Sequence, residues 1–485
     1  MSTHKLIGGI SLLRLITDPK KDDVPVPLPP KIPEIKPKGQ AQPIPPSPPK
    51  LKEIDKGAKG KMEILPPETE EEKQEAKEKA KKEVAIAFTE MKKLSKLERF
   101  PGIDEREYKD LVLPRRILGV GNYTPIIGDA AIRAIGYGTD HRDNPLGLME
   151  FKRRAPRDSD VVIEIKYCGI CHSDWHVILD EWKNTRYPVI PGHEITGIVI
   201  AIGLAVRKFK VGDSVGLGPA YNSCRRCEQC LSSNVQYCLN DLTETYNFPD
   251  RLGDELKPTG PVTHGGYSTV IVADQHYVFS IPQDAPLEKI APLLCAGLTM
   301  WTPLITIGVD SKNKVGIIGI GGLGHIGVKL AKALGATVIA FTHTAEKLQD
   351  IRALGADDVV LSSDLKRMKE YEGKLDLIID TIPFNHDLTM YINLVRPAGV
   401  FWNIGSLMVM ATDFELLGRM NIAIKGSILG SLQDSQDLIN FCVERGIYPE
   451  VKLIGASEIN DTHRKIVESE VRYRYVIDIS TITQT

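Results

Sequence analysis

The chain has 485 residues, of which 42% are hydrophobic and 26% are charged, and its formal net charge at pH 7 is −2. This near-neutral charge does not favour a nucleic-acid partner, and no stretch contains the roughly 18 apolar residues that a membrane-spanning helix needs. The composition therefore predicts a soluble protein with a sizeable core, no nucleic-acid partner and no membrane span.

Residues 1–131 differ in composition from the rest of the chain and are predicted to form an N-terminal extension. The apolar run at 6–16 is too short to cross a membrane, and its single arginine and few hydroxyl groups disfavour a mitochondrial presequence. Twelve prolines between positions 19 and 49 predict an extended linker over 19–50. A capping box then begins a charged helix at about 69–99, which is either a solvated spacer or a segment whose second half docks on a partner, such as a larger protein assembly, or on the enzyme body.

Four of the eight cysteines lie close together, at Cys224, Cys227, Cys230 and Cys238. Four thiolates at this spacing complete the tetrahedral shell of Zn²⁺ and leave no position for a substrate. The pattern therefore predicts a structural zinc site. A disulfide cluster and an iron–sulfur site are the alternatives.

Other candidate metal ligands are scattered along the chain. Cys171 and His172 lie in the segment YCGICHSD, His193 lies in GHE, and Cys295 lies in LLCAG. Two thiolates and one imidazole would leave the fourth position of a zinc ion open for water or an alcohol, and zinc there would act as a Lewis acid. Any one of these residues alone is weak evidence, because an isolated histidine in an apolar stretch is more often a buried structural residue.

A glycine-rich segment between positions 315 and 327 indicates dinucleotide binding. An apolar strand leads into a turn, and a helix to Leu334 and a second strand at 337–341 follow it. Such glycines let the backbone approach a pyrophosphate at the helix N-terminus. The residues of the turn expected to bind the cofactor are Gly319, Gly321, Gly322, Leu323 and Gly324.

The end of the second strand indicates which coenzyme is used. An NAD enzyme carries an acidic residue there for the ribose 2′-hydroxyl, whereas this chain has none. NADP(H) is favoured instead, because small polar and basic side chains follow the strand. Those expected to bind its 2′-phosphate are Thr342, His343, Thr344 and Lys347.

These motifs, in this order, resemble those of the zinc-dependent medium-chain alcohol dehydrogenases, and most of all the NADP(H)-dependent cinnamyl alcohol dehydrogenase and aldehyde reductase branch. The resemblance covers about 132–478. It implies an α/β fold with a partly open, GroES-like β-barrel over 132–282 and 436–485. A doubly wound parallel Rossmann sheet is implied over 283–435, with strands near Val315, Val338, Val359, Leu377, Val400 and Ile428.

The resemblance also implies residue roles. Cys171, His193 and Cys295 would hold a catalytic zinc, so that each chain would carry two zinc ions. Cys168 would be a buried apolar residue rather than a ligand. The remaining roles implied are Glu194 as a transient zinc ligand, Ser173 and His176 as the proton path, Asp174 as the partner that orients His193, Thr299 beside the nicotinamide, and Arg474 and, less directly, His172 near the cofactor phosphates.

The implied function is the interconversion of aldehydes and primary alcohols by hydride transfer with NADP(H). The alternative is a structural or scaffold-bound subunit that uses a dehydrogenase body with little or residual activity. A homodimer through the Rossmann domain is expected. Apart from Cys168, every cysteine but Cys442 is assigned to zinc, which predicts a reducing, intracellular location in the cytoplasm or on a cytoskeletal or other assembly.

Overall fold

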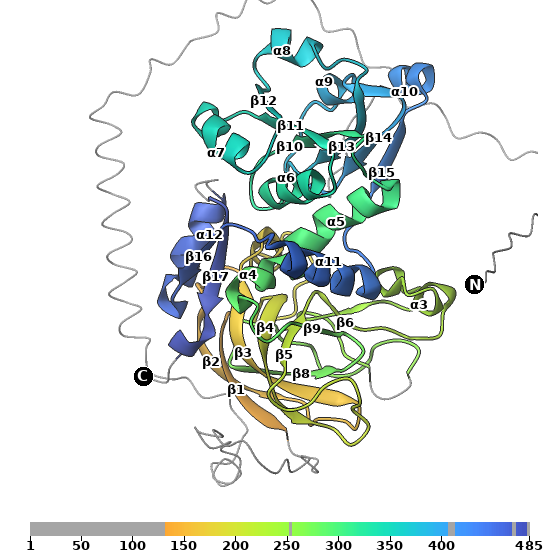
Figure 1. Ribbon diagram of the computed structural model, residues 1–485. Helices are drawn as coiled ribbons and strands as arrows, with labels where there is room; N and C mark the ends of the chain where they lie inside the picture. Colours follow the sequence, from red (N-terminus) through yellow and green to blue (C-terminus); the bar gives the residue numbers. More distant parts are fainter. Residues whose placement is uncertain (1–130, 252–254, 406–412, 468–471, 483–485) are drawn as a thin grey trace, which may run out of the picture. The chain divides into compact units, whose positions relative to one another are not determined.

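The computed structural model describes residues 131–251, 255–405, 413–467 and 472–482 (Figure 1). The predicted N-terminal extension lies outside these residues, together with its proline-rich linker at 19–50 and its charged helix at 69–99. Within the described residues the chain forms one parallel sheet with its helices and one larger antiparallel assembly.

The parallel sheet has six strands in the order β12-β11-β10-β13-β14-β15. Chain order reverses beside β10, which is the arrangement of a doubly wound sheet that binds a ligand at the carboxyl ends of its strands. Their bounds are β10 (Lys314–Ile318), β11 (Thr337–Thr342), β12 (Asp358–Leu361), β13 (Leu375–Asp380), β14 (Val395–Asn403) and β15 (Ala423–Gly426).

Five of the six predicted strand positions fall inside these strands, and the sixth falls just outside one. Ile428 lies two residues beyond β15 and is 66% exposed. β15 is an edge strand of the sheet, and all four of its residues are exposed. An edge strand is selected by its backbone pairing with β14 and not by burial of its side chains.

Helices cover both faces of the parallel sheet (Figure 1). Alternate residues of one strand enter different cores, as Ile317 of β10 packs with α5 and α6, whereas Ile318 packs with residues of α8 and α9. This explains why the strands are apolar without a polar alternation. The helices around the sheet are α5 (Ala296–Ile307), α6 (Gly324–Ala333), η4 (Ala345–Lys347), α7 (Leu348–Ala353), α8 (Leu365–Lys369), α9 (Thr389–Ile392), α10 (Phe414–Met420) and α11 (Leu432–Arg445).

The second part is built on a seven-stranded sheet in which β3 is central. β3 pairs antiparallel with β4, β8 and β17, so the C-terminal strands return to the sheet that the chain formed first. The seven strands are β3 (Asp160–Gly169), β4 (Glu194–Ile202), β5 (Ser214–Leu217), β8 (Val270–Asp274), β9 (Val278–Ser280), β16 (Val451–Ile454) and β17 (Arg474–Asp478). Two further two-stranded sheets are formed by β1 (Ile132–Gly138) with β2 (Gly147–Arg153) and by β6 (Ala220–Asn222) with β7 (Thr243–Glu244).

Short helices connect these strands. They are α2 (His172–Ile178), α3 (Glu228–Leu231), η2 (Val235–Tyr237), α4 (Leu287–Ile290), η3 (Ala291–Leu294), η5 (Ala456–Glu458), α12 (Ile459–Val467) and η6 (Ile479–Thr481). Among the described helices no single one has the length and apolar content to cross a bilayer. The segments Leu287–Leu294 and Ala296–Ile307, which meet at a bend of 58°, satisfy the criterion only together.

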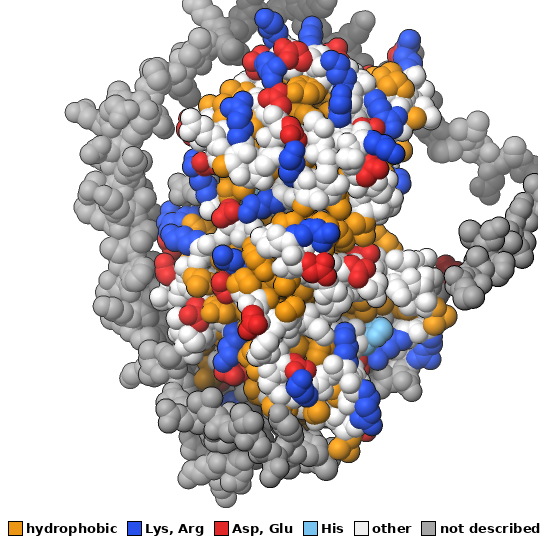
Figure 2. Space-filling view, viewed as in Figure 1, with side chains coloured by type: hydrophobic (Ala, Val, Ile, Leu, Met, Phe, Trp, Pro, Cys, Tyr) orange, Lys and Arg blue, Asp and Glu red, His pale blue; other side chains and the backbone are white. Residues whose placement is uncertain are grey.

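The surface of the described part carries charges of both signs. Figure 2 shows Lys and Arg side chains interspersed with Asp and Glu side chains over the visible face. The buried apolar residues form separate clusters, of which the three largest lie inside the antiparallel part and on the two faces of the parallel sheet.

Candidate active site and metal centres

The candidate catalytic ligands come together where β3 and β4 meet. β3 ends at Gly169 and β4 begins at Glu194, and these two residues are paired in the antiparallel ladder. Cys171 therefore lies just beyond the end of β3, beside His193, which directly precedes β4. A Cβ on Gly169 would collide with the Glu194 carboxylate, so glycine is required at this position. Cys295 reaches the same point from the start of α5.

Four ligand atoms, one each from Cys171, His193, Glu194 and Cys295, lie within 4.8 Å of one another; the first three residues are buried and Cys295 is half-buried. The two sulfur atoms are 3.9 Å apart, and His193 Nε2 lies 3.3 Å from Cys295 Sγ. Glu194 Oε2 is buried and has no hydrogen-bond partner among the described residues. Two thiols, an imidazole and an unsatisfied carboxylate oxygen form a donor set that suits Zn²⁺.

Charge in this cluster favours a thiolate. The pKa of Cys171 is held well below its usual value, because the Cys295 thiol donates to its sulfur and His193 and Arg474 lie near, and together these outweigh burial. Burial opposes ionisation of Asp174, but His193 outweighs it and lowers the pKa of that carboxyl. A metal ligand must be deprotonated, so this environment favours binding of a cation.

His193 is oriented by Asp174, which lies on α2 and is fully buried. Asp174 Oδ1 lies 3.3 Å from His193 Nδ1 and accepts from the backbone N–H of Gly192 at 3.1 Å. Its Oδ2 accepts from the backbone N–H of Cys171 at 3.0 Å and from the Tyr267 hydroxyl at 3.0 Å. The other nitrogen of His193, Nε2, thereby faces the sulfur atoms.

Arg474 connects the metal-ligand cluster with the glycine-rich turn. Its Nη2 donates to Glu194 Oε1, and a Cβ on Gly322 would lie 3.1 Å from its Nη1. Burial opposes the charge of Arg474, but Glu194 outweighs burial and raises the pKa of the guanidinium. A permanent positive charge therefore lies beside the turn, where an anionic pyrophosphate could bind.

The glycine-rich turn follows β10, as the sequence predicts. Gly319 has φ +80°, and a Cβ on Gly324 would collide with the carbonyl oxygen of Gly319, so the turn itself needs both glycines. A Cβ on Gly321 would meet no atom within 4 Å. The fold does not need a glycine there, so the open space above Gly321 fits the approach of a ligand.

The end of β11 carries the residues expected to select the coenzyme. Thr342 is buried, and its hydroxyl accepts from the backbone N–H of Thr344 at 3.2 Å, whereas His343 is exposed. The Lys347 ammonium makes no hydrogen bond or ion pair with the described residues, and burial, together with Arg472, lowers its pKa. A cation without a partner beside the strand end suits a phosphate.

The remaining residues with predicted roles lie on α2 and α5. Ser173 is half-buried, and its hydroxyl makes no hydrogen bond within the described part of the chain. His176 Nδ1 pairs with Glu181, and the His176 ring stacks on His172 at 4.7 Å between centroids. The Thr299 hydroxyl donates to the carbonyl oxygen of Ile428 at 3.2 Å.

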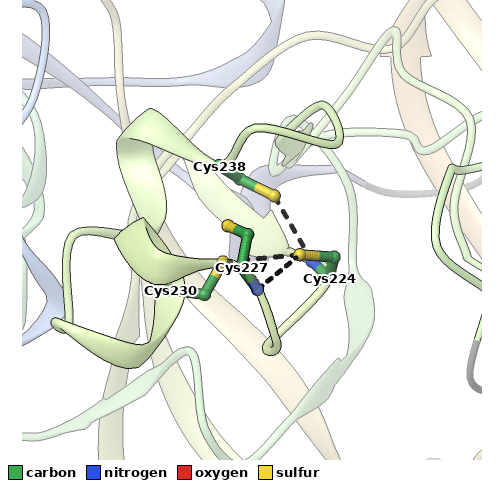
Figure 3. A group of neighbouring side chains, drawn as sticks. All are labelled: Cys224, Cys227, Cys230 and Cys238. Atoms are coloured by element: carbon green, nitrogen blue, oxygen red, sulfur yellow. Dashed lines mark hydrogen bonds between the residues drawn. The ribbon is translucent and has the colours of Figure 1, made fainter. Parts of the chain in front are cut away.

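The four cysteines of the short lobe also converge, as Figure 3 shows. Their sulfur atoms lie within 4.8 Å of one another, and no disulfide joins any of the eight cysteines, all of which lie in described segments. Burial disfavours the Cys224 thiolate, but the backbone N–H groups of Arg226 and Cys227 and the Asn240 amide lower its pKa to about 6. This arrangement fits a metal ion and not a disulfide cluster. Cys168, in contrast, is buried in the apolar core, as predicted.

Sequence reasoning missed three residues close to the catalytic cluster. Tyr246 stacks on His193, with 5.8 Å between centroids and 12° between the ring planes. Tyr267 donates to Asp174, and His463 Nε2 lies 3.3 Å from the Tyr267 hydroxyl oxygen. None of them belongs to a motif with ligand spacing, and no local signal in the sequence could have identified them.

Two protein-family models and curated relatives match this chain. The family described as "Alcohol dehydrogenase GroES-like domain" matches residues 157–283, and "Zinc-binding dehydrogenase" matches residues 322–444. NADP-dependent alcohol dehydrogenase C of Mycobacterium bovis is 41% identical over 347 residues, which are 71% of this chain and 98% of that protein.

Two solved structures are similar in fold and in sequence. The cinnamyl alcohol dehydrogenase of Sorghum bicolor has a TM-score of 0.70 and 35% identity, and the match covers 73% of this chain and 100% of that one. The cinnamyl alcohol dehydrogenase of Helicobacter pylori, solved in complex with NADP(H), has a TM-score of 0.68 and 37% identity over 72% of this chain and 99% of that one.

Proposed function

This chain belongs to the zinc-binding alcohol dehydrogenase family, and from that premise we propose that it interconverts aldehydes and primary alcohols with NADP(H). Cys171, His193 and Cys295 hold the catalytic zinc in this proposal, with Glu194 beside it. The observation that carries the proposal is the convergence of four ligand atoms, one of which is a buried, unsatisfied carboxylate oxygen. A subunit that served only as a structural component would not need this costly buried set.

When bound, these groups would supply the central chemistry: zinc would polarise the substrate oxygen, and NADP(H) would exchange a hydride with the substrate carbon. The protein's residues bind, orient and move the proton. Ser173, whose hydroxyl has no competing partner in the described part, accepts the proton of the alcohol. Ser173 releases its own hydroxyl proton as it takes that of the alcohol. His176 accepts the released proton on Nε2 and gives a proton from Nδ1 to Glu181, whose side chain is exposed to solvent.

The coenzyme is placed by two groups of residues. Gly319, Gly321, Gly322, Leu323 and Gly324 form the pyrophosphate turn, against which Arg474 lies. Thr342, His343, Thr344 and Lys347 bind the 2′-phosphate, and Thr299 contacts the nicotinamide. The unpaired Lys347 ammonium supports the choice of NADP(H), as do the relatives named for that coenzyme.

The test is a spectrophotometric assay of NADPH oxidation over a panel of aldehydes, combined with elemental analysis of zinc. Wild-type protein should turn over at least one aldehyde, and Cys171→Ala should lose both turnover and one zinc. Cys168→Ala is the matched control, because Cys168 is a nearby buried cysteine outside the ligand cluster. A zinc-replete wild type that oxidises no NADPH with any aldehyde would favour a non-enzymatic subunit.

The partner of this enzyme is expected to be a second copy of the chain. β15 is one of the two edges of the parallel sheet, and its residues, which include the apolar Ile424, are exposed. Pairing of two such edges would remove unpaired backbone groups from water. Light scattering of the purified protein should give a dimer mass, and Ile424→Lys should shift it toward the monomer.

The N-terminal extension is proposed to tether the enzyme to a larger assembly. It has no counterpart in the mycobacterial relative, 98% of which is covered by 71% of this chain. Deletion of residues 1–125 should leave kcat and KM within about twofold but release the protein from that assembly. Co-sedimentation of tagged full-length and truncated chains tests this, and an unchanged sedimentation of the truncated chain would contradict it.

We also propose the domain division. Residues 132–282 and 436–485 form the GroES-like catalytic domain, and residues 283–435 form the Rossmann domain. The return of β16 and β17 to β3 supports the discontinuous part. Helix α11 spans the second boundary and packs on α5.

A further inference from the structure

A buried chain of polar side chains extends from the catalytic cluster to the C-terminal helix. His193 is held by Asp174, Asp174 accepts from Tyr267, and Tyr267 is bonded to His463 on α12. Asp174, Tyr267 and His463 have no exposed surface. The distances are 3.3 Å, 3.0 Å and 3.3 Å, in that order along the chain.

The direction of each hydrogen bond follows from the donors available. Asp174 is an acceptor when it is ionised, so Tyr267 must donate its hydroxyl proton to Asp174 Oδ2. The Tyr267 oxygen then accepts from His463, which requires the proton to be on His463 Nε2. The other ring nitrogen, His463 Nδ1, is buried without a hydrogen-bond partner among the described residues.

Packing fixes His463 in this orientation. Its ring stacks on Trp175, with 5.4 Å between centroids and 23° between the planes. Trp175 follows Asp174 directly on α2, and α12 packs against α2. A polar ring that leaves one buried nitrogen unsatisfied carries a free-energy cost, and an apolar ring in its place would avoid that cost. A residue retained at such a cost is a candidate for a functional role.

We propose that Tyr267 and His463 are positioning residues of the catalytic metal site. They fix the Asp174 carboxylate, which in turn fixes the ring orientation and tautomer of the zinc ligand His193. This inference rests on the proposed function, since it presumes that zinc binds at Cys171, His193 and Cys295. Outer partners of a metal-ligating histidine commonly alter metal affinity by about 10- to 100-fold.

The test compares Tyr267→Phe, which removes one oxygen, with Tyr221→Phe. Tyr221 is also a buried tyrosine of the same apolar cluster, but its hydroxyl donates to the backbone carbonyl of Val272, away from the metal ligands. Zinc release from the full-length holoenzyme to a chelator is followed in each variant, and the structural zinc serves as an internal reference. The d–d absorption of Co²⁺ substituted at the catalytic site is recorded in parallel.

Tyr267→Phe should release the catalytic zinc about tenfold faster and should alter the Co²⁺ absorption bands, while the structural zinc is unaffected. Tyr221→Phe should match the wild type in both measurements. His463→Gln, which keeps a donor, should lie closer to the wild type than His463→Leu. Wild-type release and spectrum in Tyr267→Phe would overturn the inference.

Two further outcomes are informative. If Tyr267→Phe does not fold, the comparison of His463→Gln with His463→Leu replaces it, and equal zinc release from both variants would overturn the inference. If the wild type binds no zinc at the catalytic cluster, the proposed function itself fails. If instead the wild type binds zinc there and Tyr267→Phe binds it equally well, only the inference fails and the proposed function stands.

Discussion

Gly321→Ala should weaken coenzyme binding and slightly stabilise the fold. A Cβ on Gly321 meets no atom within 4 Å, and φ at this residue is not in the left-handed region. Replacing such a glycine with alanine restricts the unfolded chain and stabilises a protein by about 0.4–1 kcal/mol. The added methyl group would, however, occupy the open space that we expect the pyrophosphate of the coenzyme to fill.

The expected loss of affinity follows from the hydrogen bonds at stake. A methyl group would keep a phosphate oxygen from hydrogen-bonding distance of the backbone, and one bond to a charged acceptor contributes about 1.5–3 kcal/mol. The dissociation constant of NADPH should therefore rise by about ten- to a hundredfold. Isothermal titration with NADPH and equilibrium unfolding in urea measure the two effects separately.

Two other glycines serve as controls. Gly418→Ala adds the same methyl group into open space on α10 and should leave NADPH affinity unchanged. Gly319→Ala should destabilise the fold by about 1–3 kcal/mol, because φ is +80° and the added Cβ would lie 2.9 Å from Thr381 Oγ1. NADPH affinity within twofold of the wild type in Gly321→Ala would refute this view of the turn.

The remaining predictions concern pH, coenzyme choice, the proton path and the second metal site. Burial lowers the pKa of His325 to about 3, from the ordinary value of 6.5. Between these pH values the unfolded chain binds more protons than the folded one, so the free energy of unfolding decreases as the pH is lowered. Urea unfolding at pH 7 and pH 5 should show a loss of stability that is about 2 kcal/mol smaller in His325→Asn than in the wild type, and an equal loss in both proteins would contradict this. Thr342→Asp should favour NADH over NADPH, because its carboxylate repels the 2′-phosphate; kcat/KM for each coenzyme tests it, and a retained preference for NADPH would exclude the role of this strand end. Ser173→Ala should lose most activity while keeping its zinc; an unchanged rate would mean that solvent accepts the proton directly. Cys227→Ala should lower the melting temperature and lose one zinc, since metal binding at a closed site stabilises the fold; a full zinc content by elemental analysis would argue against the structural site.

Motifs of short range were recognisable from the sequence. The four-cysteine lobe spans 15 residues from Cys224 to Cys238, and a chain segment that short can close around one metal ion whatever the rest of the fold is. The glycine-rich turn between β10 and α6 is equally local. The structure contains the turn, the helix that was expected to reach Leu334 and the strand that was expected at 337–341.

Strand prediction was least accurate where burial did not select the residues. The sixth strand of the parallel sheet was expected near Ile428, whereas β15 ends two residues earlier, at Gly426, and is exposed. Its place is determined by hydrogen bonds to β14, which a hydropathy pattern does not report.

The sequence by itself determined which side chains could do chemistry, because metal ligands and cofactor turns require particular residue types at particular local spacings. Only the tertiary structure decided which of them meet. Cys295 reaches His193 across 102 positions, and Tyr267 reaches Asp174 and His463 across 93 and 196 positions. The physical reason is that such contacts depend on the register between β3 and β4 and on the packing of α5 and α12. Both are set by burial and backbone pairing over the whole described chain and not by neighbouring residues.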